Sequence, residues 1–199
     1  RVTELLFEGN RCVGVKASVD GRPQEFRGRE VILSSGAIHS PAHLLRAGIG
    51  PAGELKELGI AVRADRPGVG KGLMDHAAVI VAAYMQPEAR RDRRRKFHAG
   101  CGLRWSSGTD GAPQGDMFMA VLSKSTWHEV GRQLGSFLTF INKPFSEAGE
   151  VRLYGSDPLR EPRVDFNLLS DYRDVTRLLA GVKKAAGLHR LAPLKAITD

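Results

Sequence analysis

A short apolar run that leads through a glycine turn into a helix most constrains the fold of this chain. Residues 31–33 read Val-Ile-Leu, the kind of run found in the buried strand of a covered parallel sheet. A Ser-Ser-Gly turn stops the run, and Gly36 has no Cβ, so that backbone or a ligand can approach it closely. We expect Ser40 to cap the following helix, Pro41 to begin it and Gly48 to end it. Strand, glycine turn and helix in this order are common in nucleotide-binding proteins.

The order of the motifs around this segment narrows the prediction from a nucleotide-binding protein to one family. Ser-Gly-Ala-Ile-His-Ser-Pro begins at Ser35, and Leu-Leu, Ala-Gly-Ile-Gly-Pro, Leu-Gly-Ile, Pro-Gly-Val-Gly and Asp-His follow, ending at His76. This order resembles the second signature of the glucose–methanol–choline (GMC) family of flavin oxidoreductases and the loop behind it. Ala47 departs from the usual Ser, and Lys71 and Gly72 replace a more usual acidic or Arg residue and Asn. These mild changes could alter local hydrogen bonding.

A second block agrees with this resemblance. Residues 149–153, Gly-Glu-Val-Arg-Leu, are expected to form a strand, Ser-Asp-Pro follows at 156–158, and Leu-Ser-Asp stands at 169–171. The block resembles the family's substrate-domain stretch. The resemblance implies an α/β fold with an α+β part. Residues 1–77 would be part of an FAD-binding Rossmann-like domain, and residues 78–199 part of an antiparallel-sheet substrate-binding domain.

Local patterns predict several strands and one long helix. Apolar residues bounded by Gly, Pro, Asn and Ser predict strands at 2–7, 12–19, 24–26, 77–85, 102–105, 116–122, 136–141 and 150–154. The Val- and Ala-rich run at 77–85 indicates a buried strand. Residues 171–189 have helical periodicity, with Ser170 as the expected cap. The apolar face of that helix is expected to contain Val175, Leu178, Leu179, Val182 and Ala186.

The resemblance implies FAD as the cofactor and three contacts to it. Val2 matches the position whose backbone contacts the adenine, although an ordinary strand residue is an equal alternative there. Ser35 and Gly36 match the turn that packs on the adenosine half. The family holds the FAD pyrophosphate with a Gly-x-Gly-x-x-Gly turn, and the sequence contains no such turn.

The family's catalytic His lies in a C-terminal segment, which we expect beyond Asp199. No catalytic residue is therefore assigned, and the chain is expected to be an internal fragment. Alone it should neither retain FAD nor oxidise alcohols.

The implied parent enzyme is choline dehydrogenase-like. It would transfer a hydride from the CH–OH carbon of a small-molecule alcohol to the flavin, leaving an aldehyde or ketone. Two alternatives stay open: an FAD-containing hydroxynitrile lyase of the same family, and a non-catalytic basic module that binds polyanions. Neither the alcohol nor the oligomeric state can be inferred from the sequence.

The positive charge has a local source. The chain carries a formal charge of +8, and the run Arg90–Lys96 holds much of the excess. No stacking aromatic residues alternate with these charges, so we expect a solvated, mobile loop and no nucleic-acid partner; a phosphate contact or a docking role is the weaker alternative.

Other compositional features exclude several classes of protein. Cys12 and Cys101 are too few for a disulfide framework, and they favour a reducing, cytoplasmic location. No apolar run reaches the roughly 20 residues of a membrane-spanning helix. His39 and His43 have no partner pattern that completes a metal site. His76 is expected to be a structural, hydrogen-bonded histidine.

Apolar side chains in two predicted strands have two possible roles. They are candidates for the sheet face that covers a substrate, or they are ordinary core residues, and their alternation fits both roles. The candidates are Phe118, Met119, Phe137, Leu138 and Phe140.

Overall fold

The structure, a computed structural model, describes residues 1–92, 98–125 and 128–199. The chain forms two compact units. Unit 1 comprises Arg1–Met74 and Glu147–Asn167, and unit 2 comprises Asp75–Ser146 and Leu168–Asp199. The first crossing between the units lies beside the predicted division at residue 77, but the chain then returns to unit 1 for one further segment.

Unit 1 opens with a three-stranded antiparallel meander. Strands β1 (Val2–Glu8), β2 (Arg11–Val19) and β3 (Arg22–Arg27) pair in that order. Val and Leu at alternating positions supply the buried side of β1 and β2, where Leu5 and Val13 lie. The three predicted strands are confirmed, each within two residues of its expected bounds.

Helix α1 (Gly36–Arg46) begins four residues before its predicted cap. The prediction that Ser40 caps this helix is wrong, because Ser40 and Pro41 lie inside it and Ser35 occupies the N-cap position. The chain turns into the helix at Gly36, whose φ of 81° suits a residue without a side chain. Pro41 is the sixth residue of the helix, where it has no N–H to donate to the preceding turn. The predicted end at Gly48 is confirmed, since its N–H donates to the carbonyl of Leu45 at 3.0 Å.

The predicted buried strand at residues 31–33 is wrong. These residues have no regular structure, and Ile32 is 81% exposed. A buried parallel strand needs hydrogen-bonded neighbours on both sides, and no strand in the described part of unit 1 pairs with this segment. Its apolar side chains alone cannot make it a strand.

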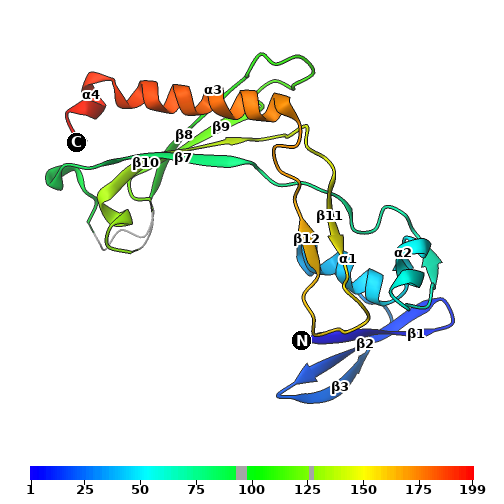
Figure 1. The fold of residues 1–199 in the computed structure, drawn as a ribbon. Coiled ribbons are helices and arrows are strands. Elements are labelled where there is room, and N and C mark those ends of the chain that lie inside the picture. Colours follow the sequence, from blue (N-terminus) through cyan, green and yellow to red (C-terminus); the bar gives the residue numbers. More distant parts are fainter. Residues whose placement is uncertain (93–97, 126–127) are drawn as a thin grey trace. The chain divides into compact units, whose positions relative to one another are not determined.

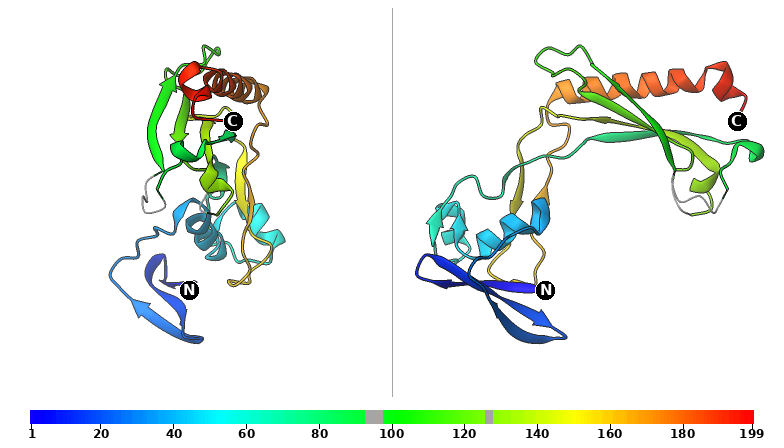
Figure 2. Two further views of the ribbon diagram at one scale, coloured as in Figure 1. Left: turned by 90° about the vertical axis from the view of Figure 1, so that its left-hand side faces the viewer. Right: turned by 180° about the vertical axis from the view of Figure 1, so that it is seen from behind.

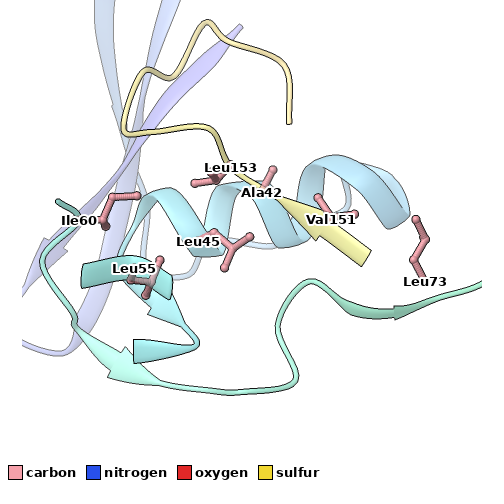
Figure 3. Packing of buried hydrophobic residues seen from close by; sticks show 7 residues of the cluster. All are labelled: Ala42, Leu45, Leu55, Ile60, Leu73, Val151 and Leu153. Carbon is pink, nitrogen blue, oxygen red and sulfur yellow. The ribbon is translucent and has the colours of Figure 1, made fainter. Parts of the chain in front are cut away.

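The core of unit 1 joins residues 42–73 with residues 151–153, which lie far apart in the sequence (Figure 3). Helices α1 and α2 (Ala52–Glu57) pack with strands β6 (Lys71–Leu73) and β11 (Gly149–Arg152). The sheet order is β12-β11-β6, where β12 is Arg163–Asp165, and the two-residue strands β4 (Ile49–Gly50) and β5 (Ala64–Asp65) pair in parallel. The buried cluster contains Ala42, Leu45, Leu55, Ile60, Leu73, Val151 and Leu153.

Unit 2 contains a four-stranded antiparallel sheet. Its strands follow the order β7 (Ala78–Tyr84), β10 (Leu134–Ile141), β9 (Met117–Leu122) and β8 (Ala99–Trp105). Two 3-10 turns, η1 (Pro87–Ala89) and η2 (Gly131–Gln133), lie outside the sheet. The predicted strands are confirmed, but the predicted burial of residues 77–85 is wrong, because β7 is an edge strand whose Ile80 is 48% exposed.

Helix α3 (Tyr172–His189) runs along one face of this sheet, followed by the short α4 (Ala192–Lys195) (Figures 1 and 2). A Cβ on Gly181 would lie 2.5 Å from Thr139 Oγ1, so this glycine permits a close approach of helix and sheet. The buried core residues on this face include Met117, Met119, Phe137, Ile141, Leu178 and Ala185.

The predicted helix at 171–189 is confirmed, but its cap and buried face differ from the prediction. Asp171, not Ser170, caps α3, and its carboxylate accepts the Arg173 N–H at 2.9 Å. Leu179 is 53% exposed, whereas Asp174 and Arg177 are buried. Leu178 is buried and Val175, Val182 and Ala186 are half-buried, so the apolar pattern located the packed side of the helix but missed its charged residues. No helix among the described residues is long and apolar enough to cross a membrane.

Candidate functional site

The three predicted flavin contacts all lie in unit 1. Val2 is half-buried in β1 opposite Ala17, and Ser35 and Gly36 are exposed at the start of α1. A Cβ built on Gly36 meets no atom within 4 Å, and the Ser35 side chain makes no capping hydrogen bond. The start of α1 is therefore open to a ligand. This open space would allow the adenosine half of FAD to approach Gly36 closely. The 199 residues contain no glycine turn that could bind the pyrophosphate.

A hollow of about 380 Å³ lies between β1 and α1 in unit 1, and Glu4 is the one acidic residue in its lining. Lys16, His43 and Arg46 line it, while Val2, Ser35 and Gly36 do not. Burial lowers the pKa of His43, and the nearby Arg46 lowers it further. The sequence analysis missed this hollow, because its cations come from a strand and a helix that are far apart in the sequence.

Unit 2 presents a sheet face that α3 does not cover. Cross-strand partners form two adjacent rows on it. One row is Ala78, Phe140, Phe118 and Arg104, and the other is Ile80, Leu138, Ala120 and Gly102. We call these two rows the open face. Side chains alternate along a strand, and the intervening Met119, Phe137 and Thr139 point toward α3, so the open face lies on the opposite side.

Aromatic rings form a continuous layer on the open face. The rings of Phe118 and Phe140 have centroids 5.1 Å apart, and His76 stacks on Phe140 at 5.1 Å with an interplanar angle of 17°. A Cβ on Gly102 would lie 2.5 Å from Phe118 Cζ, so the missing side chain leaves room for that ring over β8. The backbone N–H of His76 donates to Asp75 Oδ1 at 2.7 Å.

The structure divides the five candidate apolar residues into core residues and residues of the open face. Met119 and Phe137 are core residues, 0% and 5% exposed, and pack with Ala185 of α3. Phe118 and Phe140, like Leu138, lie half-buried on the open face. Alternation within each strand was visible in the sequence, but which side the helix covers was not.

A buried ion network fixes α3 to the sheet. The Arg177 guanidinium is fully buried and donates to Asp116 Oδ2 at 2.9 Å, to the Lys143 carbonyl at 3.1 Å and to Asp174 Oδ1. Burial alone would raise the pKa of Asp116, but hydrogen bonds from Ser107 and Arg177 outweigh it and hold that pKa below its usual value.

The second carboxylate of the network is held in the same way. Asp174 accepts the Phe145 and Ser146 N–H groups at 3.0 and 2.9 Å and the Ser146 hydroxyl at 2.7 Å. Burial alone would raise the pKa of Asp174, but these hydrogen bonds and the contact with Arg177 lower it. The spacing of Asp174 and Arg177 was a visible signal in the sequence, whereas Asp116 lies 61 residues before Arg177. This network supports the sheet that carries the open face.

Three of the charged residues in the predicted loop Arg90–Lys96, Arg90, Arg91 and Asp92, lie within the described part. The Arg90 Nε donates to the Met85 carbonyl at 2.9 Å. Residues 93–96 of the loop lie outside the described residues, so the prediction of mobility stays a prediction.

Comparison with known sequences gives consistent matches. The profile of the family described as GMC oxidoreductase matches residues 1–78. A protein of Methylovorus sp. (strain MP688), named 5-(hydroxymethyl)furfural oxidase, is 42% identical over 92% of this chain and 34% of its own length. A protein of Staphylococcus saprophyticus, named oxygen-dependent choline dehydrogenase, is 40% identical over 94% of this chain and 38% of its own length. The chain spans little more than a third of these relatives.

Comparison with solved structures extends the match to the whole chain. Formate oxidase of Aspergillus oryzae superposes with a TM-score of 0.85 at 20% identity, covering 100% of this chain and 44% of that one. Pyridoxine 4-oxidase of Mesorbium loti gives a TM-score of 0.84 at 23% identity, covering 100% of this chain and 40% of that one. At this level of identity the likeness shows a common fold.

Proposed function

Because this chain belongs to the GMC oxidoreductase family, we propose that the protein containing it is an FAD-dependent enzyme that oxidises the CH–OH group of a small alcohol. The observation that carries the proposal is the match of two motif blocks in family order, together with relatives that cover more than nine-tenths of the chain. FAD, when bound, accepts the hydride that leaves the alcohol carbon.

Unit 1 is proposed to supply part of the FAD-binding surface. Val2 would contact the adenine through its backbone, and Ser35 and Gly36 would pack on the adenosine half. The support is the positive φ of Gly36 and the open space around its Cα. A side chain at this position would hinder a close contact and strain the backbone.

Unit 2 is proposed to supply one wall of the substrate site through the open face. Its support is the half-buried aromatic layer of Phe118 and Phe140 on the side of the sheet without a helix. Apolar walls of this kind exclude water and orient a small organic substrate, while a few polar groups fix its reacting end. The chain offers no convincing base for the alcohol proton among its described residues, so that role is proposed to lie elsewhere in the enzyme.

The rival functions have weaker support. The names of the relatives described above do not support a hydroxynitrile lyase. A basic binding module stays an untested alternative, which salt-dependent binding of a polyanion by the isolated chain would favour.

The proposed function is tested with the full-length protein that contains this chain. Adding a panel of primary alcohols without oxygen should bleach the visible absorbance of its bound flavin. If no alcohol in the panel does so, the proposed activity is wrong.

A pair of glycine variants tests the FAD contact separately. Gly36→Ala should weaken FAD binding by about tenfold or more, equivalent to about 1.4 kcal/mol. Gly59→Ala is the matched control, because Gly59 also has a positive φ (69°) and free space around it but is not a proposed contact. Equal loss of FAD in both variants would indicate backbone strain alone and would remove Gly36 from the site.

A further inference from the structure

The hollow between β1 and α1 collects polar side chains from three separate segments of unit 1. Lys16 comes from β2, and His43 and Arg46 come from α1. Ser156 comes from the loop that follows β11. A volume of about 380 Å³ is enough for a small ligand.

Two of these side chains are cations without an anionic partner. Lys16 and Arg46 are both half-buried, and neither forms an ion pair with any residue that the structure describes. Arg46 Nη2 donates to the Arg160 carbonyl at 2.7 Å, which fixes the guanidinium at the wall of the hollow. Because both cations have lost part of their hydration without gaining a counter-charge, an anion beside them would be stabilised.

One carboxylate in the lining reduces this positive charge but does not cancel it. Glu4 is exposed opposite Lys16 in the β1–β2 ladder, and within the described ranges it has no ion pair. Glu161 lies outside the lining, where it pairs with Arg1 at 2.8 Å. Lys16 and Arg46 against Glu4 leave an excess of positive charge before His43 is counted.

His43 responds to the same excess of positive charge. Burial lowers the pKa of this imidazole, and the positive charges of Arg46, His39 and Arg1 lower it further. A bound anion would oppose these effects and favour a protonated ring that can donate from either nitrogen. The hydroxyl of Ser156, which has no hydrogen-bond partner in the described part of the chain, supplies a neutral donor.

We infer that the hollow binds a small oxyanion of the phosphate class, with Lys16 and Arg46 as its main partners and His43 and Ser156 as further donors. Charge-assisted hydrogen bonds from guanidinium and ammonium groups to phosphate are among the stronger ones in proteins. The bound anion would connect β2 and α1 with the loop after β11, and would therefore stabilise unit 1.

This anion site is distinct from the proposed cofactor contacts. Val2, Ser35 and Gly36 do not line the hollow. The inference therefore does not depend on the proposed function, and a protein that oxidises no alcohol could still bind the anion.

Calorimetric titration of the full-length protein, saturated with FAD and held at constant ionic strength, tests the inference. Inorganic phosphate should bind saturably with a Kd of about 1 mM or tighter. Glycerol 3-phosphate is the second probe: tighter binding of the ester assigns the hollow to a phosphorylated metabolite, and weaker binding assigns it to free phosphate. Absence of saturable binding by both probes, or release of FAD by phosphate, would overturn the inference.

Variants with opposite expected effects locate the site. Lys16→Gln should weaken phosphate binding by about tenfold or more, and Glu4→Gln should strengthen it by about threefold because a repelling carboxylate is removed. A general loss of fold cannot produce both changes. Lys56→Gln is the matched control, because Lys56 is an exposed lysine of unit 1 outside the lining and its replacement alters the net charge equally.

Two results would contradict the assignment to this hollow. Equal phosphate affinities in Lys16→Gln and Lys56→Gln would show that the anion responds only to net charge or binds elsewhere. Unchanged or weaker binding in Glu4→Gln would show that the anion does not lie beside this carboxylate.

Discussion

Replacing Arg177 by Met should destabilise unit 2 by about 3 kcal/mol. Arg177 is 1% exposed and forms ion pairs with two carboxylates that are themselves buried, Asp116 and Asp174. Removing one partner of a buried ion pair typically costs about 3–5 kcal/mol, because a buried charge is left without compensation. The lower end applies here, since Asp116 keeps two donors from Ser107 and Asp174 keeps donors from Phe145 and Ser146. Methionine has a similar length, so the cavity left behind is small.

The measurement is urea-induced unfolding followed by tryptophan fluorescence. Both tryptophans of the chain, Trp105 and Trp127, lie within the sequence of unit 2, and Trp105 packs against the core that α3 covers. Lys183→Met is the matched control. Lys183 is an exposed cation on the same helix, so its loss should scarcely move the unfolding midpoint.

The pH dependence of the Arg177→Met effect provides a second readout. The pKa values of Asp116 and Asp174 are lowered in the folded protein, so their ionised forms stabilise it above the unfolded pKa of about 3.9. That stability is lost as the pH falls through the folded pKa values. The deficit of the variant should therefore be largest near neutral pH and shrink below about pH 4. A loss under about 1 kcal/mol at neutral pH, or one independent of pH, would refute this account of the network.

Three further outcomes follow from the structure. Gly181→Ala should destabilise unit 2 by about 1–3 kcal/mol in the same urea assay, because the added Cβ would meet Thr139 Oγ1 at 2.5 Å; an unchanged midpoint would contradict the close packing of α3. Ser40→Ala should change stability by less than about 0.5 kcal/mol, since Ser40 lies inside α1 and not at its cap; a loss near 1 kcal/mol would restore the cap. The polypeptide of residues 1–199 should be colourless after gel filtration with added FAD, because it contains no Gly-x-Gly-x-x-Gly turn to bind the pyrophosphate; flavin that co-elutes with the protein would show that the turn is dispensable.

Acid titration tests the cap of α3. Hydrogen bonds from the Arg173 side chain and backbone lower the pKa of Asp171 to about 2. The stability that ionised Asp171 contributes is present above its unfolded pKa of about 3.9 and is lost as the pH falls toward 2. Asp171→Asn should therefore flatten the pH dependence of unfolding between about pH 4 and pH 2. The same slope in both proteins would show that the cap is not coupled to protonation.

Local patterns predicted the strands and the long helix well, because alternation and helical periodicity depend on neighbours in the sequence. The prediction of a strand at residues 31–33 failed because strand formation depends on partner strands, which an apolar run does not reveal. The cap at Ser40 failed because Pro41 was taken as the first helical residue, whereas the chain enters the helix through the positive φ of Gly36.

The candidate site was predictable only in part. Motif order indicated the family and pointed to Val2, Ser35 and Gly36, whose contact with FAD stays a prediction. The open face required knowing which side of the sheet α3 covers. The buried residues Asp174 and Arg177 make α3 look polar where it packs, so the predicted apolar face omitted them and wrongly included the exposed Leu179, although its other four members are buried or half-buried.

The return of the chain to unit 1 has a consequence for synthesis on the ribosome. Lys71 of β6 binds Glu150 of β11, 79 residues later, and Val151 and Leu153 complete the apolar core of unit 1. Leu45 and Leu55 leave the ribosomal exit tunnel before Val151 and Leu153 do. Until Val151 and Leu153 follow, Leu45 and Leu55 lack part of their packing. The nascent N-terminal segment must therefore wait for most of unit 2 to be translated, which exposes it to chaperones and proteases during that interval. A polypeptide cut at residue 77 would remain permanently in this incomplete state.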